Sequence, residues 1–156
     1  MPTAILVSTA DAVLSVLSDN KFSQEFEPVR SYADWELPLE DSDDLHVDVV
    51  PVGSPDMELE TRGSIGYTPQ VDIVIRKRMA AGQQEPDGTV ILPDVDDLVF
   101  LVQEIAEYFV VDRFGDLESI AWQRTQILAA YKPSHLRQHR QFTGIVRLTF
   151  SAQTDL

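Results

Sequence analysis

The chain has 156 residues, 44% of them hydrophobic, which suits one folded domain with a core and argues against disorder. It has no cysteine, and this excludes disulfides, zinc–thiolate sites and cysteine nucleophiles. The net charge of -14 is unevenly placed, because residues 120–156 carry five basic and one acidic residue whereas residues 31–61 carry ten acidic and no basic ones.

The first third of the chain predicts one helix and two strands. Residues 3–18 place apolar side chains at helical spacing, which predicts an amphipathic helix. This stretch does not predict a signal peptide, because it lacks a basic start and Asp11 interrupts its apolar run. Residues 27–38 read as an irregular strand and residues 45–52 as a second strand, separated by a turn or acidic loop at "EDSDD" (40–44).

The third predicted strand is the stretch "GYTPQVDIVIRKR", residues 66–78, after a loop at 53–63. Its apolar and polar residues alternate, which predicts one long, half-buried strand with the apolar side under a helix. The strand ends in three cations, Arg76, Lys77 and Arg78, which the alternation leaves on an outer face and tip available to other molecules.

The last part predicts a helix and two strands. A broad apolar stripe over residues 93–110, with Asp94 as the N-cap, predicts a helix lying across a sheet. Residues 119–131 and 142–152 predict two paired strands, joined by a polar, basic connection at 132–141. The order α-β-β-β-α-β-β predicts a single α+β domain over residues 1–156, with two helices on a mainly antiparallel sheet of about five strands.

The sequence contains no residue pattern typical of an enzyme or of a cofactor site. His135 and His139 stand four apart, but Pro133 and the polar surroundings favour an exposed basic loop over a metal site. A metal-dependent nuclease would draw on Asp48, Asp72 and Lys77, yet Asp72 and Lys77 are five apart and point to opposite faces of one strand. We therefore expect no enzyme activity, no metal and no cofactor. No apolar run reaches the roughly 18 residues of a membrane span.

A resemblance is carried by the N-terminal helix and four further segments, which are residues 26–53, 60–78, 95–110 and 141–152. Together they resemble the tail terminator, or tail completion, proteins at the head–tail junction of tailed bacteriophages. The resemblance covers nearly the whole chain and rests on strand patterns. It implies a structural virion protein, made in the host cytoplasm, that forms a hexameric ring on the head-proximal end of the tail tube. Such a ring ends tube polymerisation and joins the tail to the neck.

The resemblance implies as partners other copies of the chain, the tail tube and sheath subunits, and the neck or connector proteins. Genomic DNA would pass through the ring without specific binding, and no membrane is involved. Alternatives that stay open are another neck component, such as a head-completion or stopper adaptor, a metal-dependent nuclease, and a host binding module with no phage role.

The charge pattern suggests two surfaces on such a ring. Oppositely charged regions allow head-to-tail contacts, although acidic loops that only maintain solubility would explain the pattern equally well. The predicted subunit or tail-tube interface consists of Arg76, Lys77, Arg78, Lys132, His135, Arg137, His139 and Arg140. The predicted acidic lumen, which would repel DNA phosphates, consists of Asp41, Asp43, Asp44, Asp56, Glu58 and Glu60.

Overall fold

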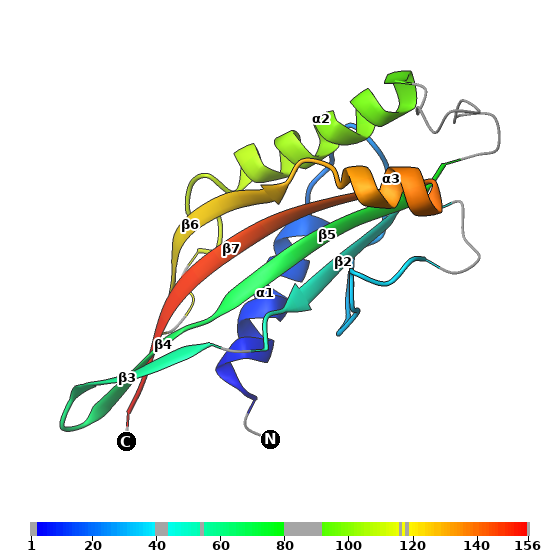
Figure 1. Cartoon of the computed structure of the whole chain (residues 1–156). Helices are drawn as coiled ribbons and strands as arrows, with labels where there is room; N and C mark the ends of the chain where they lie inside the picture. The colour runs from blue at the N-terminus through cyan, green and yellow to red at the C-terminus, as the bar shows by residue number, and fades with distance from the viewer. Residues whose placement is uncertain are drawn as a thin grey trace.

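A computed structural model describes residues 3–39, 44–53, 55–79, 92–115, 117 and 119–155. The chain is α+β, as the sequence predicts, with three helices and a mostly antiparallel seven-stranded sheet in the described part (Figure 1). The elements in chain order are α1 (Ile5–Ser18), β1 (Val29–Arg30), β2 (His46–Pro51), β3 (Asp56–Thr61), β4 (Ser64–Thr68), β5 (Gln70–Arg78), α2 (Leu92–Tyr108), β6 (Ile120–Ala129), α3 (Pro133–His139) and β7 (Gln141–Asp155).

The strand order of the sheet is β1-β2-β5-β7-β4-β3, and β6 also pairs with β7. The 15-residue β7 therefore pairs with three other strands, β4, β5 and β6. Both β5 and β6 pair with residues 145–149 of β7, so they lie on opposite sides of it. β4, which precedes β5 and is separated from it by Pro69, lies on the same side of β7 as β5 and pairs with residues 152–155 of β7. All pairings are antiparallel except that of β1 with β2.

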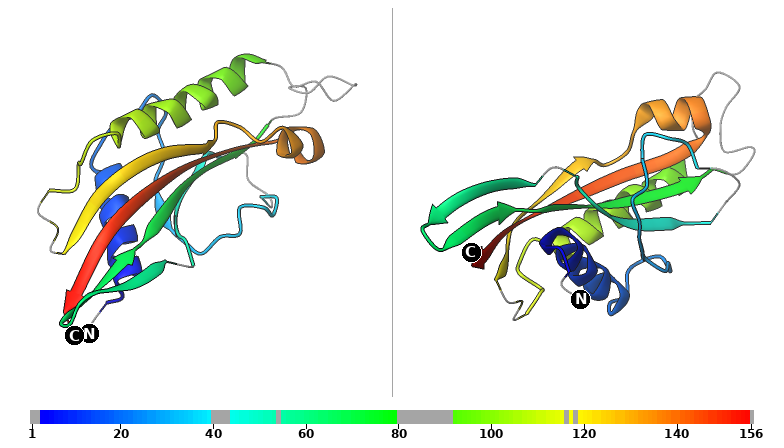
Figure 2. Two further views of the ribbon diagram at one scale, coloured as in Figure 1. Left: turned by 60° about the vertical axis from the view of Figure 1, so that its left-hand side comes forward. Right: turned by 90° about the horizontal axis from the view of Figure 1, so that it is seen from below.

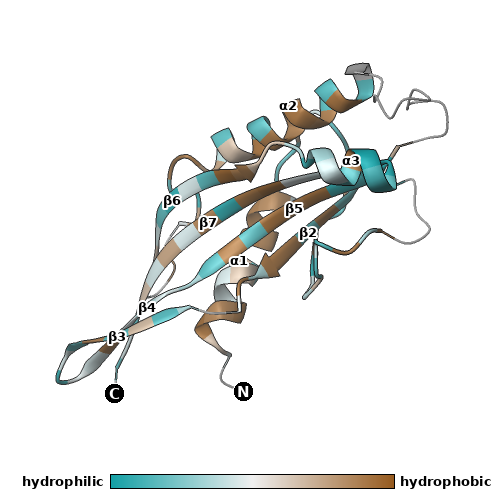
Figure 3. Ribbon diagram, in the orientation of Figure 1, coloured by the Kyte–Doolittle hydropathy of each residue, from teal (hydrophilic) through white to brown (hydrophobic). Residues whose placement is uncertain are grey.

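The core lies between one face of the sheet and the helices α1 and α2 (Figure 2). Figure 3 shows both helices with apolar stripes, because their apolar residues recur every three or four positions. Leu101 and Ile105 of α2, and Phe109 just after its end, are fully buried against this face. From β7, Phe150 is also fully buried, and it belongs to the same cluster. We call this side of the sheet the helix face.

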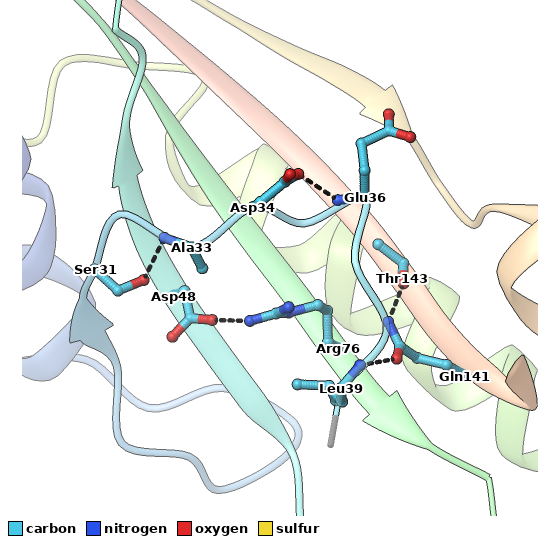
Figure 4. Close-up of polar contacts among 9 residues, drawn as sticks. All are labelled: Ser31, Ala33, Asp34, Glu36, Leu39, Asp48, Arg76, Gln141 and Thr143. Atoms are coloured by element: carbon cyan, nitrogen blue, oxygen red, sulfur yellow. Dashed lines mark hydrogen bonds and ion pairs between the residues drawn. The ribbon is translucent and has the colours of Figure 1, made fainter.

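The opposite face of the sheet is crossed by residues 31–39, which we call the strap (Figure 4). The backbone N–H of Leu39 donates to the side-chain oxygen of Gln141 at 2.6 Å. Near the middle of the strap, Glu36 faces Lys132 across 3.5 Å. We call this side of the sheet the strap face, and the strap explains why β5 is buried on both faces along most of its length.

Three predictions for the first half of the chain differ from the structure. The single strand predicted over 66–78 is divided at Pro69 into β4 and β5, because proline has no N–H to donate to the ladder. The loop predicted over 53–63 contains β3, which forms a hairpin with β4 although none of its residues is buried. The irregular strand predicted over 27–38 is limited to the two residues of β1. The count of about five strands was therefore too low.

The helix count of two was also too low. The predicted basic connection contains α3, whose Pro133 stands in the first turn, where no backbone N–H is needed inside the helix. The second predicted helix is present as α2, but it begins at Leu92, so Asp94 lies in its first turn and is not the N-cap. The paired strands β6 and β7 confirm the prediction for the end of the chain.

Candidate interaction surfaces

Within the described residues, the two-residue β1 and two longer strands, β3 and β6, each have a partner strand on one side only. β3 pairs only with β4, and β6 pairs only with β7. Ala152 of β7 pairs with Tyr67 of β4 on one side and with Ile120 of β6 on the other. The two open edges therefore lie on opposite sides of the sheet. Unpaired N–H and C=O groups at such edges can bind a strand of another chain.

The β3–β4 hairpin projects from one end of the sheet, at the lower left of Figure 1. Every residue of β3 is exposed, including Met57 (65%) and Leu59 (67%). Met57 lies opposite Tyr67, which lines a cavity together with the start of α1, so Met57 and Leu59 belong to the helix face. Glu58, between them, belongs to the strap face. This strand thus presents apolar groups on one side and acid on the other.

The edge strand β6 has the same division between its two faces. Thr125 and Ile127 lie opposite Leu148 and Val146 of the buried cluster and so belong to the helix face. Arg124, on the strap face, is the only charged residue of β6. Beside the helix face of β6 runs a groove of about 430 Å³, lined by Gln103, Ala106, Glu107, Val110, Thr125 and Ile127.

The predicted basic interface is partly inside the subunit. Arg76 is only 7% exposed and its guanidinium donates to Asp48 at 2.5 Å (Figure 4). His135 is 5% exposed and its Nδ1 lies 2.7 Å from the Thr143 hydroxyl. The expectation that these two side chains are exposed is wrong, because β5 is covered by the strap and α3 is folded against β7.

The other predicted interface residues are divided between two places. Lys132, Arg137, His139 and Arg140 belong to α3 or flank it, and Arg137 and Arg140 are exposed. Lys77 and Arg78 are half-buried at the end of β5. Lys77 lines a cavity of about 420 Å³ with Asp94 and Asp97. The interface role of these residues stays a prediction.

The predicted acidic lumen residues do not form one patch. Asp56, Glu58 and Glu60 share β3, where Glu60 bonds to Gln153. Asp44 precedes β2 at the end of the sheet where His46 pairs with Arg76, whereas the hairpin lies at the opposite end of β5. Asp41 and Asp43 fall outside the described residues. Among the described members, only the carboxylates of β3 lie together.

The strap face of the sheet holds polar side chains that pair within the chain. Asp72 is 3% exposed and accepts two bonds from Arg147, at 2.7 and 2.9 Å. These bonds raise the pKa of Arg147 above its usual value. Burial, and then the nearby Lys132, lower the pKa of His135. The neutral imidazole that results suits its bond to a threonine hydroxyl.

The residues considered for a nuclease are not brought together. Asp48 and Asp72 both lie on the strap face, but each is bonded to an arginine. Lys77 lies on the helix face, as the five-residue spacing predicts. In the part of the chain that the structure describes, no group of three or more His, Asp or Glu side chains is arranged to hold a metal.

Searches against protein-family models and against curated proteins find no match to this chain. Among the described residues, none of the helices has the length and apolar character needed to cross a membrane.

Proposed function

We propose that this chain is a structural subunit of a tailed-phage virion, and that it forms a ring at the head-proximal end of the tail tube. The ring would end tube polymerisation and join the tail to the neck. The proposal starts from the resemblance of five segments to the tail terminator family. The α+β fold agrees with the α+β subunit that this resemblance implies.

One observation supports a ring more than any other, namely that the open edges of β3 and β6 lie on opposite sides of one sheet. A ring needs heterologous contacts, in which one surface of a subunit meets a different surface of the next. The two edges differ in charge, because β3 carries three carboxylates and β6 carries one arginine. Such a pair of surfaces favours head-to-tail association over symmetric pairing.

The test is the solution mass by light scattering, with negative-stain images of the same concentrated sample. We expect rings with a central hole, and a cyclic assembly that binds the end of isolated tail tubes and stops their growth. A chain that stays monomeric alone and also fails to bind tube ends would overturn the proposal.

Images of the chain mixed with isolated tail tubes, and of the chain mixed with filled heads, separate the terminator from its nearest alternative, a head-completion or stopper adaptor. A terminator binds the end of the tail tube in the absence of heads. A stopper binds filled heads in the absence of tails. We expect binding to tubes, and binding to heads alone would assign the chain to the neck.

A further inference from the structure

We propose that copies of this chain join by strand pairing, with the β3 edge of one subunit added to the β6 edge of the next. The inference rests on the proposed function only in assuming self-association, and it deepens that function by naming the two surfaces that meet. It concerns a contact between identical chains, so it holds for a ring of any number of subunits.

The edge of β6 lacks the features that normally keep a strand from pairing with another chain. Natural edge strands are short, or carry several charges or a proline. β6 has ten residues, a single charge at Arg124 and no proline. Ile127 and Leu128 on it are 45% and 43% exposed. In an isolated subunit this edge would be an aggregation hazard, so a specific partner strand explains its composition.

The regular parts of the two strands have matching lengths. In β6, the pairing with β7 is regular from Arg124 to Ile127 and shifts on either side of this run. In β3, the pairing with β4 is regular from Asp56 to Leu59 and shifts beyond it. Shifts of this kind are β-bulges, which bend a strand and interrupt its edge. Each edge therefore offers one four-residue segment suited to ladder formation.

The strand directions also agree with a ring. β6 and β4 are both antiparallel to β7, and β3 is antiparallel to β4, so β3 and β6 run in opposite directions. The paired segments lie at different levels along β7, because Met57 is level with Ala152 whereas Arg124 pairs with Thr149. The strands must therefore be inclined to the ring axis, as they are in a closed β-barrel. Rotation about that axis keeps the relative direction of the strands and the side of the sheet on which the helices lie. β3 of one copy would therefore meet β6 of the next as an antiparallel pair, in one continuous sheet.

In that continuous sheet, apolar side chains pack together on one face and opposite charges pair on the other. On the helix face, exposed Met57 comes opposite Thr125 and beside Ile127, two residues that line the groove between α2 and β6. On the strap face, Glu58 comes beside Arg124. Cross-strand pairs of apolar residues and of opposite charges both stabilise a sheet. A one-residue slip would place the acids against the groove, so the pattern also fixes the register.

The test uses the absence of cysteine from the chain, which makes engineered thiols the only ones present. Asp56→Cys and Gln126→Cys, two exposed residues that lie opposite each other when Glu58 faces Arg124, are made as separate variants, mixed at high concentration and oxidised. We expect a disulfide-linked dimer in the mixture and far less in either variant alone. The matched control mixes Val29→Cys with Gln126→Cys, because Val29 is an exposed residue (54%) of β1, a different strand. Equal yields from both mixtures, or no dimer from the first, would overturn the pairing.

A charge exchange tests the same contact without cysteine. Arg124→Glu should weaken association by about fivefold, since it places like charges across the strand pair. Adding Glu58→Arg to the same chain should restore association. Failure of the second substitution to restore it would overturn the pairing of these faces.

Failure of this inference is distinguishable from failure of the proposed function. Rings that bind tail tubes but give no disulfide between the Asp56→Cys and Gln126→Cys variants would leave the function and remove the pairing. Linked rings that bind neither tubes nor heads would leave the pairing and remove the virion role.

Discussion

β5 and β3 belong to the same sheet and both carry acidic residues between apolar ones, but their side chains have opposite surroundings. Asp72 of β5 is buried and bonded to Arg147, and Val74 beside it is fully buried. Glu58 and Leu59 of β3 are exposed, and the ion pairs of the described residues include no carboxylate of β3.

This difference separates residues that stabilise the subunit from residues that folding does not explain. Asp72 and Arg76 of β5 have partners within the chain, so their presence needs no second molecule. The apolar and acidic residues of β3 have almost no packing partners, so β3 is where contact with another chain should be sought. The predictions below test whether the two strands differ in this way.

The largest effect is expected from breaking the buried ion pair. Arg147→Ala leaves Asp72 without its partner at a site where the Asp72 side chain is 4% exposed. Removing one member of a buried pair destabilises a fold by about 3–5 kcal/mol. Glu58→Ala, in the exposed strand, should change the free energy of unfolding by less than about 0.5 kcal/mol. Urea unfolding of both variants measures the two values.

A second variant checks the reason for that loss. Replacing both members, as Asp72→Val with Arg147→Leu, leaves no buried charge and should cost less than Arg147→Ala alone. A double variant less stable than the single one would mean that the pair stabilises the sheet by its geometry and not by mutual neutralisation.

Replacing a glycine by alanine compares the buried part of the sheet with the exposed hairpin, because each contains one glycine within a strand. A Cβ on Gly144 would lie 2.5 Å from a methyl of Val102 in α2 and 3.3 Å from the carbonyl oxygen of Ala130. Gly144→Ala should therefore cost about 1–3 kcal/mol by overpacking. Gly66→Ala in the hairpin meets only the side chain of Glu60, which can turn away, and should be close to neutral. Thermal unfolding of the two variants tests this, and equal losses would contradict it.

The third effect depends on pH. Burial and Lys132 hold the pKa of His135 below its usual 6.5, so the unfolded chain binds a proton more readily than the folded chain. The contribution of His135 is present above about pH 6.5 and is lost as the pH falls toward the lower, folded pKa. His135→Gln should remove this part of the slope of stability against pH.

Urea unfolding at several pH values between about 8 and 6, above the range in which carboxylates titrate, measures the slope. His139→Gln, on the same helix, is the control and should keep most of the His135 contribution, because His139 lowers the pKa of His135 less than burial and Lys132 do. Lys132, His139 and Arg76 all disfavour a positive charge on the buried His135 ring. Of the nearby charged groups, Glu36 alone favours that charge. An unchanged slope in His135→Gln would contradict the prediction.

The sequence predicted the elements whose apolar residues recur with the period of a helix or a strand. The apolar stripes of α1 and α2 and the alternating apolar residues of β7 belong to the core between the sheet and the helices. β3 was missed because its alternation of Met57 and Leu59 buries nothing in the subunit. α3 was missed because Pro133 is as typical of a helix start as of a loop.

The candidate surfaces were less accessible to sequence reasoning than the fold. No local pattern in the sequence indicates that Arg76 and His135 are buried. The strap is held by contacts between residues about a hundred positions apart, from Leu39 to Gln141 and from Glu36 to Lys132. The open edges of β3 and β6 depend on which strands become neighbours. Pairing of distant strands is set by the whole sheet and not by any local pattern.

The smallest effect is expected at the strap, which is charged like β3 but has partners in the chain. The Lys132 ammonium lies 3.5 Å from Glu36 and 4.2 Å from the centre of the Trp35 ring. Glu36→Ala removes a pair whose acidic member is 64% exposed and should cost less than about 0.5 kcal/mol. Lys132→Ala also removes the contact with the ring and should cost about 0.5–1 kcal/mol.

Hydrogen exchange of the Leu39 amide measures this local effect, since that N–H is bonded to Gln141 at the end of the strap. We expect faster exchange in Lys132→Ala than in Glu36→Ala, with little change in global stability. Unchanged exchange in both variants would mean that the Gln141 bond holds the strap without the lysine. In either case the strap is held by contacts within one subunit, whereas the β3 edge has no partner strand among the described residues and depends on a second copy for one.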